Sequence, residues 1–280
     1  MRADLHIHTT ASDGIFPPEA IVAMAKEHNL NVIAVTDHDT TSGISGAQAA
    51  ANDLQITFIP GVEISAGGDL EIHVLGYGIN PDAKSLKTLF SAMQDERIMR
   101  TKAILQRLEQ LGCPLDSEAV FASAMGVVGR PHIARAMVEK GYVPTVQDAF
   151  RKYLSKGKPA FVSREKLDTA HVIRILTEAG GVPVLAHPTL LNMPQEHLLP
   201  LLSQWKDAGL MGIEVYHPTQ RGAFDSWRRL ADRFGFLITG GSDYHAPDRA
   251  DGPLGGVAAD WQTAENDIQH LQTLIGHALQ

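Results

Sequence analysis

The chain opens on a stretch in which apolar and polar residues alternate: Leu5 and Ile7 alternate with His6 and His8. Alternation with a period of two predicts a β-strand whose successive side chains point to opposite faces. Both imidazoles then lie on one face, about 7 Å apart at a rise of ~3.3 Å per residue, while Leu5 and Ile7 face a core. Such a pair can bind one divalent ion, although a strand with two surface histidines gives the same pattern.

Short apolar runs rich in β-branched residues predict further strands at residues 31–36, 57–63, 69–76, 181–187, 212–217 and 236–245. Helical periodicity predicts helices at residues 17–28, 42–52, 169–179, 196–208, 219–234 and 264–278. Repeated strand–helix units favour a parallel sheet in an α/β fold. Because there are about seven strands and no Gly-x-Gly-x-x-Gly turn, we expect a closed barrel rather than a doubly wound sheet.

The pattern changes between residues 84 and 158, where helical periodicity covers 84–111, 116–124, 131–140 and 145–154 without a strand-like run. We therefore expect an all-helical insertion (residues 84–158) in a barrel built from residues 1–83 and 159–280. The insertion carries 13 Lys/Arg and 7 Asp/Glu, a balance of +6, whereas the rest of the chain has a balance of −14. An acidic body suits bound cations and a basic insertion suits an anionic substrate, although solvated helix faces would give the same charges.

Three further features concern the setting of the protein. The sequence contains no run of 18 or more apolar residues, so it predicts no membrane span. No basic-then-apolar leader precedes the first strand. The single cysteine, Cys113, excludes an internal disulfide. These features predict a cytoplasmic protein, and the sequence indicates no obligatory protein partner.

Histidines and carboxylates recur where the predicted strands end. In parallel barrels the functional residues lie at the C-terminal ends of the strands. The residues in such positions are His8, Asp37, His38, Glu63, His187, His217 and Asp243. This recurrence favours a metal site over scattered surface histidines.

Five motifs carry a resemblance to a known family: Asp4-Leu-His-Ile-His-Thr9, Thr36-Asp-His-Asp39, Gly61-Val-Glu63, His187-Pro188 and Gly241-Ser-Asp-Tyr-His245. In this order they resemble the motifs of the PHP (polymerase and histidinol phosphatase) family. The resemblance implies a distorted seven-stranded barrel that binds two or three divalent metals. Gly129-Arg-Pro-His132 and Gly157-Lys-Pro-Ala-Phe-Val162 resemble the subgroup acting on 3′,5′-bisphosphonucleotides and on the 5′ ends of short RNA.

The resemblance also implies three ligand sets. The first ion would be held by His6, His8, Glu63 and Asp243, the second by Glu63, His73 and His187, and the third by Asp13, His38 and His245. Mixed imidazole and carboxylate ligands suit Mn²⁺, Fe²⁺ or Zn²⁺ better than Mg²⁺ or Ca²⁺. We expect Mn²⁺. Asp37 and Asp39 are expected to orient ligands rather than to bind metal.

Four residues are candidates for substrate binding. Arg130 precedes a predicted helix, where a guanidinium could bind a phosphate; a structural ion pair is the alternative. Lys158 could likewise bind a phosphate or form a structural ion pair, and His132 could contact substrate or face the helix interior. His217 could contact substrate or protonate the leaving oxygen.

Together these observations predict a metal-dependent phosphohydrolase whose catalytic residues are Glu63, His217 and Asp243. Bound metals lower the pKa of water and so supply a hydroxide near neutral pH, which a bridging Glu63 would place between two ions. The expected substrate is a nucleoside 3′,5′-bisphosphate that loses its 3′ phosphate, or the 5′ end of a short RNA. The alternatives are a monoesterase resembling histidinol phosphatase and a non-catalytic module stabilised by metal.

Overall fold

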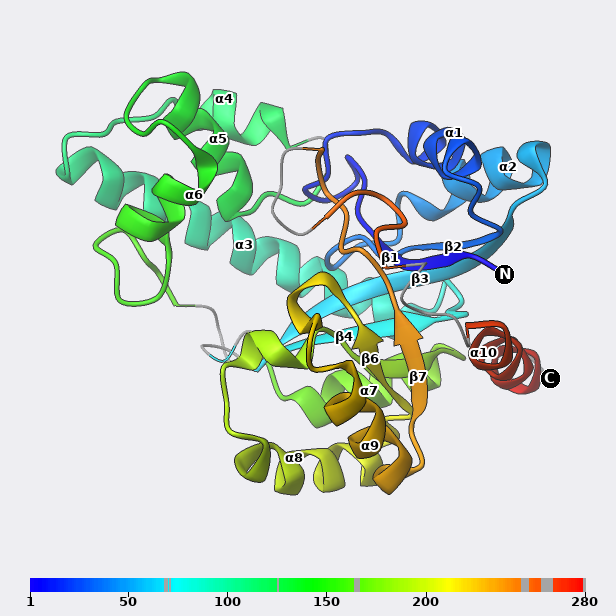
Figure 1. The fold of residues 1–280 in the computed structure, drawn as a ribbon. Coiled ribbons are helices and arrows are strands. Elements are labelled where there is room, and N and C mark those ends of the chain that lie inside the picture. Colours follow the sequence, from blue (N-terminus) through cyan, green and yellow to red (C-terminus); the bar gives the residue numbers. More distant parts are fainter. Residues whose placement is uncertain are drawn as a thin grey trace.

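Seven strands form one sheet at the centre of the molecule (Figure 1). The structure is a computed structural model and describes all residues except 68–69, 71, 125, 164–166, 248–251, 258–263 and 279–280. The strands follow one another around the sheet in chain order: β1 (Ala3–Ile7), β2 (Val32–Val35), β3 (Thr57–Ala66), β4 (Ile72–Tyr77), β5 (Val182–Leu185), β6 (Gly212–Tyr216) and β7 (Leu237–Gly240). Of the predicted strand 69–76, residues 69 and 71 lie outside the described part.

Helices cover the barrel on its outside, as the strand–helix pattern predicts. These are α1 (Pro18–Glu27), α2 (Ile44–Leu54), α7 (Thr169–Glu178), α8 (Gln195–Asp207), α9 (Phe224–Phe234) and α10 (Ala264–Ala278). Short 3₁₀ turns, η3 (Pro188–Leu191) and η4 (Pro218–Gln220), follow β5 and β6. The helix predicted at 219–234 therefore begins later, at Phe224.

β4 departs from the parallel arrangement that the strand–helix repeat predicts. It runs antiparallel to both β3 and β5, whereas the other neighbouring strands pair in parallel. Only five residues separate β3 from β4, too few for the crossover that a parallel pair requires. As a result the N-terminal end of β4, which carries His73, lies opposite Ser65 near the C-terminal end of β3.

The sheet nearly closes because β1 meets the segment that follows β7. Ile7 pairs with Tyr244, and the buried carboxylate of Asp4 accepts hydrogen bonds from the backbone N–H groups of Ser242 (2.9 Å) and Gly255 (2.7 Å). A Cβ atom on Gly241 would collide with the backbone of His6, so this approach requires glycine. The predicted seven-stranded barrel is confirmed, with the distortion that β4 introduces.

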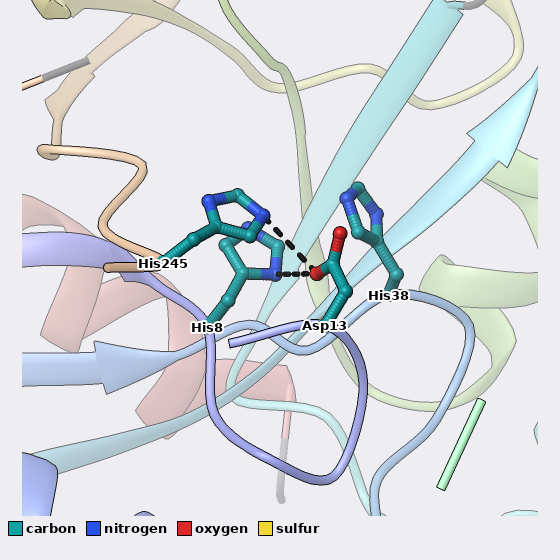
Figure 2. A group of neighbouring side chains, drawn as sticks. All are labelled: His8, Asp13, His38 and His245. Carbon is teal, nitrogen blue, oxygen red and sulfur yellow. Dashed lines mark ion pairs between the residues drawn. The ribbon is translucent and has the colours of Figure 1, made fainter. Parts of the chain in front are cut away.

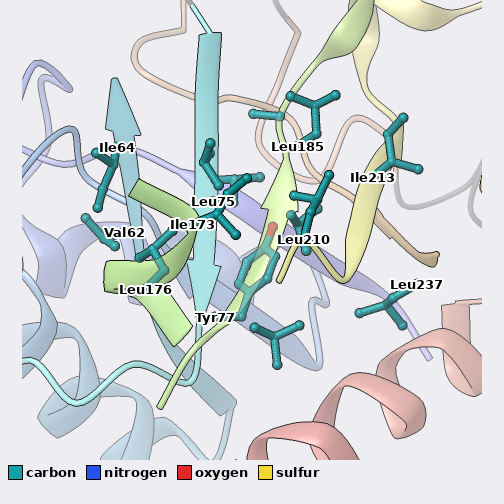
Figure 3. Close-up of a cluster of buried hydrophobic side chains, with 14 of the residues drawn as sticks. Val62, Ile64, Leu75, Tyr77, Ile173, Leu176, Leu185, Leu210, Ile213 and Leu237 are labelled. Atoms are coloured by element: carbon teal, nitrogen blue, oxygen red, sulfur yellow. The ribbon is translucent and has the colours of Figure 1, made fainter. Parts of the chain in front are cut away.

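The main core fills the barrel and the space beneath α7 (Figure 3). Leu75, Leu185 and Ile213 from three strands are completely buried, as are Ile173 and Leu176 of α7. Each such side chain stabilises the fold by about 1.5–3 kcal/mol relative to an exposed one. The core therefore holds the strand ends, and the residues that follow them, in fixed positions.

Residues 84–158 contain no strand within their described part, as predicted. They form α3 (Lys84–Gln110), α4 (Ser117–Ser123), α5 (Arg130–Glu139), α6 (Val146–Ala149) and a π-helical turn, η2 (Phe150–Leu154), on one side of the barrel (Figure 1). A separate apolar cluster, including Ile104, Leu108 and Ile133, packs these helices together. The first turns of α3 belong to the barrel core instead, through Leu86 and Leu89.

Among the helices that the structure describes, none combines the length and the apolar character needed to cross a membrane.

Candidate metal centre

Glu63 of β3 lies at the centre of a cluster of imidazoles and is completely buried. Its Oε1 is 2.8 Å from His73 Nδ1 and 2.9 Å from His187 Nε2. Its Oε2 is 2.9 Å from His38 Nδ1 and 3.3 Å from His8 Nε2. Four segments of the barrel thus converge on one carboxylate, and both of its oxygens face nitrogens that could share a cation with it.

Asp243 is the second carboxylate of the cluster and follows β7. Its Oδ1 lies 3.1 Å from His8 Nε2 and 3.4 Å from His6 Nε2. The backbone of Asp243 is left-handed (φ 53°), and so is that of His187 (φ 24°). Non-glycine residues in this region are strained, and such strain concentrates at functional sites.

Asp13 belongs to a further group of neighbouring side chains, with His8, His38 and His245 (Figure 2). Asp13 Oδ1 is 3.1 Å from His245 Nε2 and 3.9 Å from His8 Nδ1. The rings of His8 and His245 stack with their centroids 4.0 Å apart. His38 completes the group from the loop after β2.

The donor atoms fit divalent cations. In three groups, all donor atoms lie within 4.8 Å of one another: His6, His8, Glu63 and Asp243; His38, Glu63 and His73; and His8, Asp13, His38 and His245. Several buried donor atoms lack a hydrogen-bond partner among the described residues: His6 Nε2, both ring nitrogens of His8, His38 Nδ1 and Glu63 Oε2. Buried polar atoms are costly to leave unsatisfied, and bound cations would satisfy these.

The groups differ in detail from the predicted ligand sets. The first set is brought together as predicted. His187 contacts Glu63 but falls outside the tight group around His73, and His8 joins the residues predicted for the third ion.

The surrounding imidazoles favour the ionised form of the two carboxylates. Burial alone would raise the pKa of Glu63, but the imidazoles of His38, His73 and His6 outweigh it and hold that pKa well below its usual value. Burial is likewise outweighed at Asp243, where His6 and His245 hold the pKa well below its usual value. A buried pair of anionic side chains provides the negative charge that a divalent cation requires.

Asp37 and Asp39 hold backbone segments next to proposed ligands. The Asp37 carboxylate accepts hydrogen bonds from Thr9 N–H (2.7 Å) and the Ser12 hydroxyl (2.7 Å). It thereby fixes the loop that leads from His8 to Asp13. Asp39 Oδ1 accepts the backbone N–H of Ser65 at 2.8 Å.

A cavity opens above the cluster, between the barrel and the insertion. His38, Glu63, His73, His187, Asp13, Asp243 and His245 line it on the barrel side. Arg97 and Arg100 of α3 and Arg130 of α5 line it on the insertion side. Arg130 stacks on Phe150, with its guanidinium carbon 5.6 Å from the ring centroid. The sequence pointed to Arg130 but not to Arg97 or Arg100, because helical periodicity alone did not show which face of α3 meets the barrel.

The other predicted substrate residues do not line this cavity. His132 of α5 is buried where this helix meets α4 and the loop after β1, and its Nδ1 accepts the N–H of Gly129 at 3.2 Å. Lys158 is exposed. His217 is completely buried behind Asp243, with its Nε2 3.6 Å from Asp243 Oδ2.

Sequence reasoning missed Glu214 of β6, which is completely buried and contacts two of the predicted ligands. Its Oε1 lies 3.0 Å from His6 Nδ1, and its Oε2 is 2.8 Å from the backbone N–H of His187. The signal was present, because an ionisable residue interrupts the apolar run Gly-Ile-Glu-Val-Tyr. Burial raises the pKa of Glu214, but His6, His217 and His187 outweigh burial and lower it below its usual value.

Comparison with known proteins agrees with this geometry. Residues 4–158 match the family model described as PHP domain. The chain is 35% identical over 251 residues to a 5′-3′ exoribonuclease of Haemophilus influenzae, covering 88% of this chain and 90% of the relative. It is 33% identical to a 3′,5′-nucleoside bisphosphate phosphatase of Chromobacterium violaceum, covering 87% of each.

A solved structure shows the same fold. The structure of a candidate metal-dependent phosphoesterase from Bifidobacterium adolescentis superposes with a TM-score of 0.83 at 31% identity, covering 95% of each chain. Fold, cluster and relatives therefore agree: the chain belongs to the PHP domain family and is a hydrolytic, metal-dependent phosphoesterase.

Proposed function

We propose that this enzyme removes the 3′ phosphate from nucleoside 3′,5′-bisphosphates, giving nucleoside 5′-monophosphates, and that it also acts on the 5′ ends of short RNA. The observation that carries the proposal is the two-sided cavity. One wall holds the imidazoles and carboxylates, and the facing wall holds Arg97, Arg100 and Arg130. This arrangement suits a substrate with one phosphate to cleave and a second anionic group to bind. The names of the two relatives support the same substrate class.

The metal centre of this proposal uses nine residues. They are His6, His8, Asp13, His38, Glu63, His73, His187, Asp243 and His245, holding two or three ions, with Mn²⁺ preferred and Fe²⁺ or Zn²⁺ as alternatives. Divalent cations bound there would lower the pKa of water and neutralise phosphate charge. Elemental analysis of protein purified without chelators, after growth with added Mn²⁺, tests this: two to three ions per chain are expected, and a value near zero would contradict it.

In this scheme the protein side chains have separate tasks. Glu63 contributes both of its oxygens to the centre. Asp243 contributes a second carboxylate, next to His8. His217 does not reach the cavity, so in place of the predicted substrate contact we propose that it orients Asp243. Arg130 would bind the phosphate that is not cleaved, while His132 and Lys158 would act only indirectly.

We also propose that residues 84–158 form a lid that supplies the arginine wall, and that the protein works in the cytoplasm. The lid proposal is supported by the separate apolar cluster of its helices and by the three arginines that it places over the barrel. A monoesterase resembling histidinol phosphatase is the alternative. A substrate with one phosphate and a basic group would bring no second anionic group to this arginine wall.

The test is a phosphate-release assay with purified protein and Mn²⁺. Adenosine 3′,5′-bisphosphate, histidinol phosphate and a short 5′-phosphorylated RNA are compared at equal concentration, and the nucleotide product is identified by chromatography. We expect the bisphosphate to give the highest kcat/KM and adenosine 5′-monophosphate as product. Preference for histidinol phosphate, or release of the 5′ phosphate instead, would contradict the proposal.

A further inference from the structure

We propose that Glu214 is a positioning residue of the metal centre, which fixes the His6 ring and the His187 backbone at the same time. No family motif identified above includes Glu214, and it does not line the cavity. The inference rests on the metal centre of the proposed function, because it concerns how two of its ligands are held.

The geometry joins two ligands from different parts of the barrel. His6 lies on β1 and His187 follows β5, and Glu214 of β6 holds one with each carboxylate oxygen. All the partners are buried: Glu214 and His6 are 0% exposed and His187 is 5% exposed. Water therefore cannot replace either hydrogen bond.

The contact with His6 determines which ring nitrogen can bind a cation. A carboxylate only accepts hydrogen bonds, so His6 Nδ1 must carry a proton and donate it to Glu214. In the neutral ring the lone pair then lies on Nε2. This atom faces the cluster, 3.4 Å from both Glu63 Oε2 and Asp243 Oδ1. A hydrogen-bonded carboxylate of this kind fixes the tautomer and orientation of a ligating histidine.

The contact with His187 supports a strained backbone. His187 has a φ of 24°, outside the regions that L residues normally occupy. Its N–H is held by Glu214 Oε2 at 2.8 Å while its Nε2 reaches Glu63. Glu214 thus stabilises the turn that aims this ring at the centre.

Glutamine cannot replace Glu214 in this role, although it has the same shape. Both partners donate, and a side-chain amide has only one accepting oxygen. If the amide NH₂ faces His6, the ring must accept at Nδ1 and carry its proton on Nε2, where it blocks a cation. If the NH₂ faces His187 instead, two donors meet and the strained turn loses its partner.

The experiment measures the Mn²⁺ affinity of the metal-free protein by equilibrium dialysis. Glu214→Gln should bind Mn²⁺ roughly 10- to 100-fold more weakly than wild type. The matched control is Tyr77→Phe. It removes another completely buried hydrogen bond of the barrel interior, from the Tyr77 hydroxyl to the Leu5 carbonyl (2.9 Å), and leaves the carboxylate of Glu214 in place. The control should keep the wild-type affinity.

The outcomes separate this inference from the proposed function. If wild type binds no Mn²⁺, the proposed metal centre fails and this inference fails with it. If wild type binds and Glu214→Gln binds equally well, or if Tyr77→Phe weakens binding as much, only the role of Glu214 is overturned.

A second measurement needs no Glu214 variant, in case that variant does not fold. In wild-type protein loaded with Zn²⁺ and labelled with ¹⁵N-histidine, NMR should show His6 protonated at Nδ1 and ligated through Nε2. The His6 signals are assigned by their loss in His6→Gln. The reverse tautomer would overturn the proposal.

Discussion

Arg97, near the middle of helix α3, forms an ion pair with Asp39, which directly follows the proposed ligand His38. Arg97 Nε lies 2.9 Å from Asp39 Oδ2, and the other Asp39 oxygen accepts the backbone N–H of Ser65. Asp39 is only 3% exposed and has a left-handed backbone (φ 54°). One carboxylate therefore ties the insertion, the loop after β2 and strand β3 together.

Removing Arg97 should destabilise the fold strongly, because the buried charge of Asp39 loses its guanidinium partner. For Arg97→Ala we expect a loss of roughly 3–5 kcal/mol in the free energy of unfolding. Urea denaturation of Arg97→Ala, Asp39→Asn and the double variant measures the coupling between the two side chains. The double variant should lose less than the sum of the single losses. Strict additivity would show that the pair contributes nothing specific.

Glu63→Gln should abolish turnover while leaving the fold largely intact. A neutral amide cannot provide two anionic oxygens to the surrounding imidazoles, so Mn²⁺ content should fall together with activity. The loss in kcat/KM should exceed ~100-fold, the upper range for residues that act only through a ligand. Metal analysis, circular dichroism and phosphate release are measured on the same sample. Near-normal activity with normal metal content would refute the central position of Glu63.

Arg130→Ala should discriminate between substrates. A hydrogen bond to a charged group is worth about 1.5–3 kcal/mol, which corresponds to roughly a 10- to 150-fold loss in kcat/KM. This loss is expected for a nucleoside 3′,5′-bisphosphate and not for a simple aryl phosphate, since only the former has a second phosphate. Lys152→Ala, which removes an exposed positive charge from the same insertion, is the control. Equal losses on both substrates would assign Arg130 to the scissile phosphate or to the fold through Phe150.

His132 should make the metal-free protein less stable in mild acid. Burial, followed by the charge of Arg135, lowers the pKa of His132 from 6.5 to about 4. Between these two values the unfolded chain binds a proton that the folded chain does not, so stability falls as the pH decreases from 6.5 to 4. The shift corresponds to roughly 3 kcal/mol. Above pH 6.5 this contribution is fully present.

The matched variant is His132→Gln, because a glutamine side chain at this helix position can also accept the N–H of Gly129. Its stability should depend less on pH than that of wild type across this window. Urea denaturation at pH 7 and pH 4.5, without metal, compares the two. Parallel pH dependence would show that another group causes the acid sensitivity.

Much of the barrel follows from local sequence, since period-two alternation and apolar runs depend on neighbouring residues. The orientation of β4 does not follow from the same patterns, and only the short connection after β3 indicated it. Most of the histidines were found because family motifs mark them. Glu214 and Arg97 escaped because their importance depends on partners far away in the chain: His6 is 208 residues from Glu214, and Asp39 is 58 residues from Arg97.

Helix α3 affects which substrates fit the cavity. Its 27 residues include neither glycine nor proline, the residues at which helices most often bend. One end is embedded in the barrel core through Leu86 and Leu89, and the other lies in the insertion's own cluster through Ile104 and Leu108. The helix therefore connects the two cores without a residue that favours a bend, and this holds Arg97 and Arg100 at a set distance from the imidazoles. The enzyme would then select phosphate esters by the distance between their anionic groups, because that distance must match the spacing across the cavity.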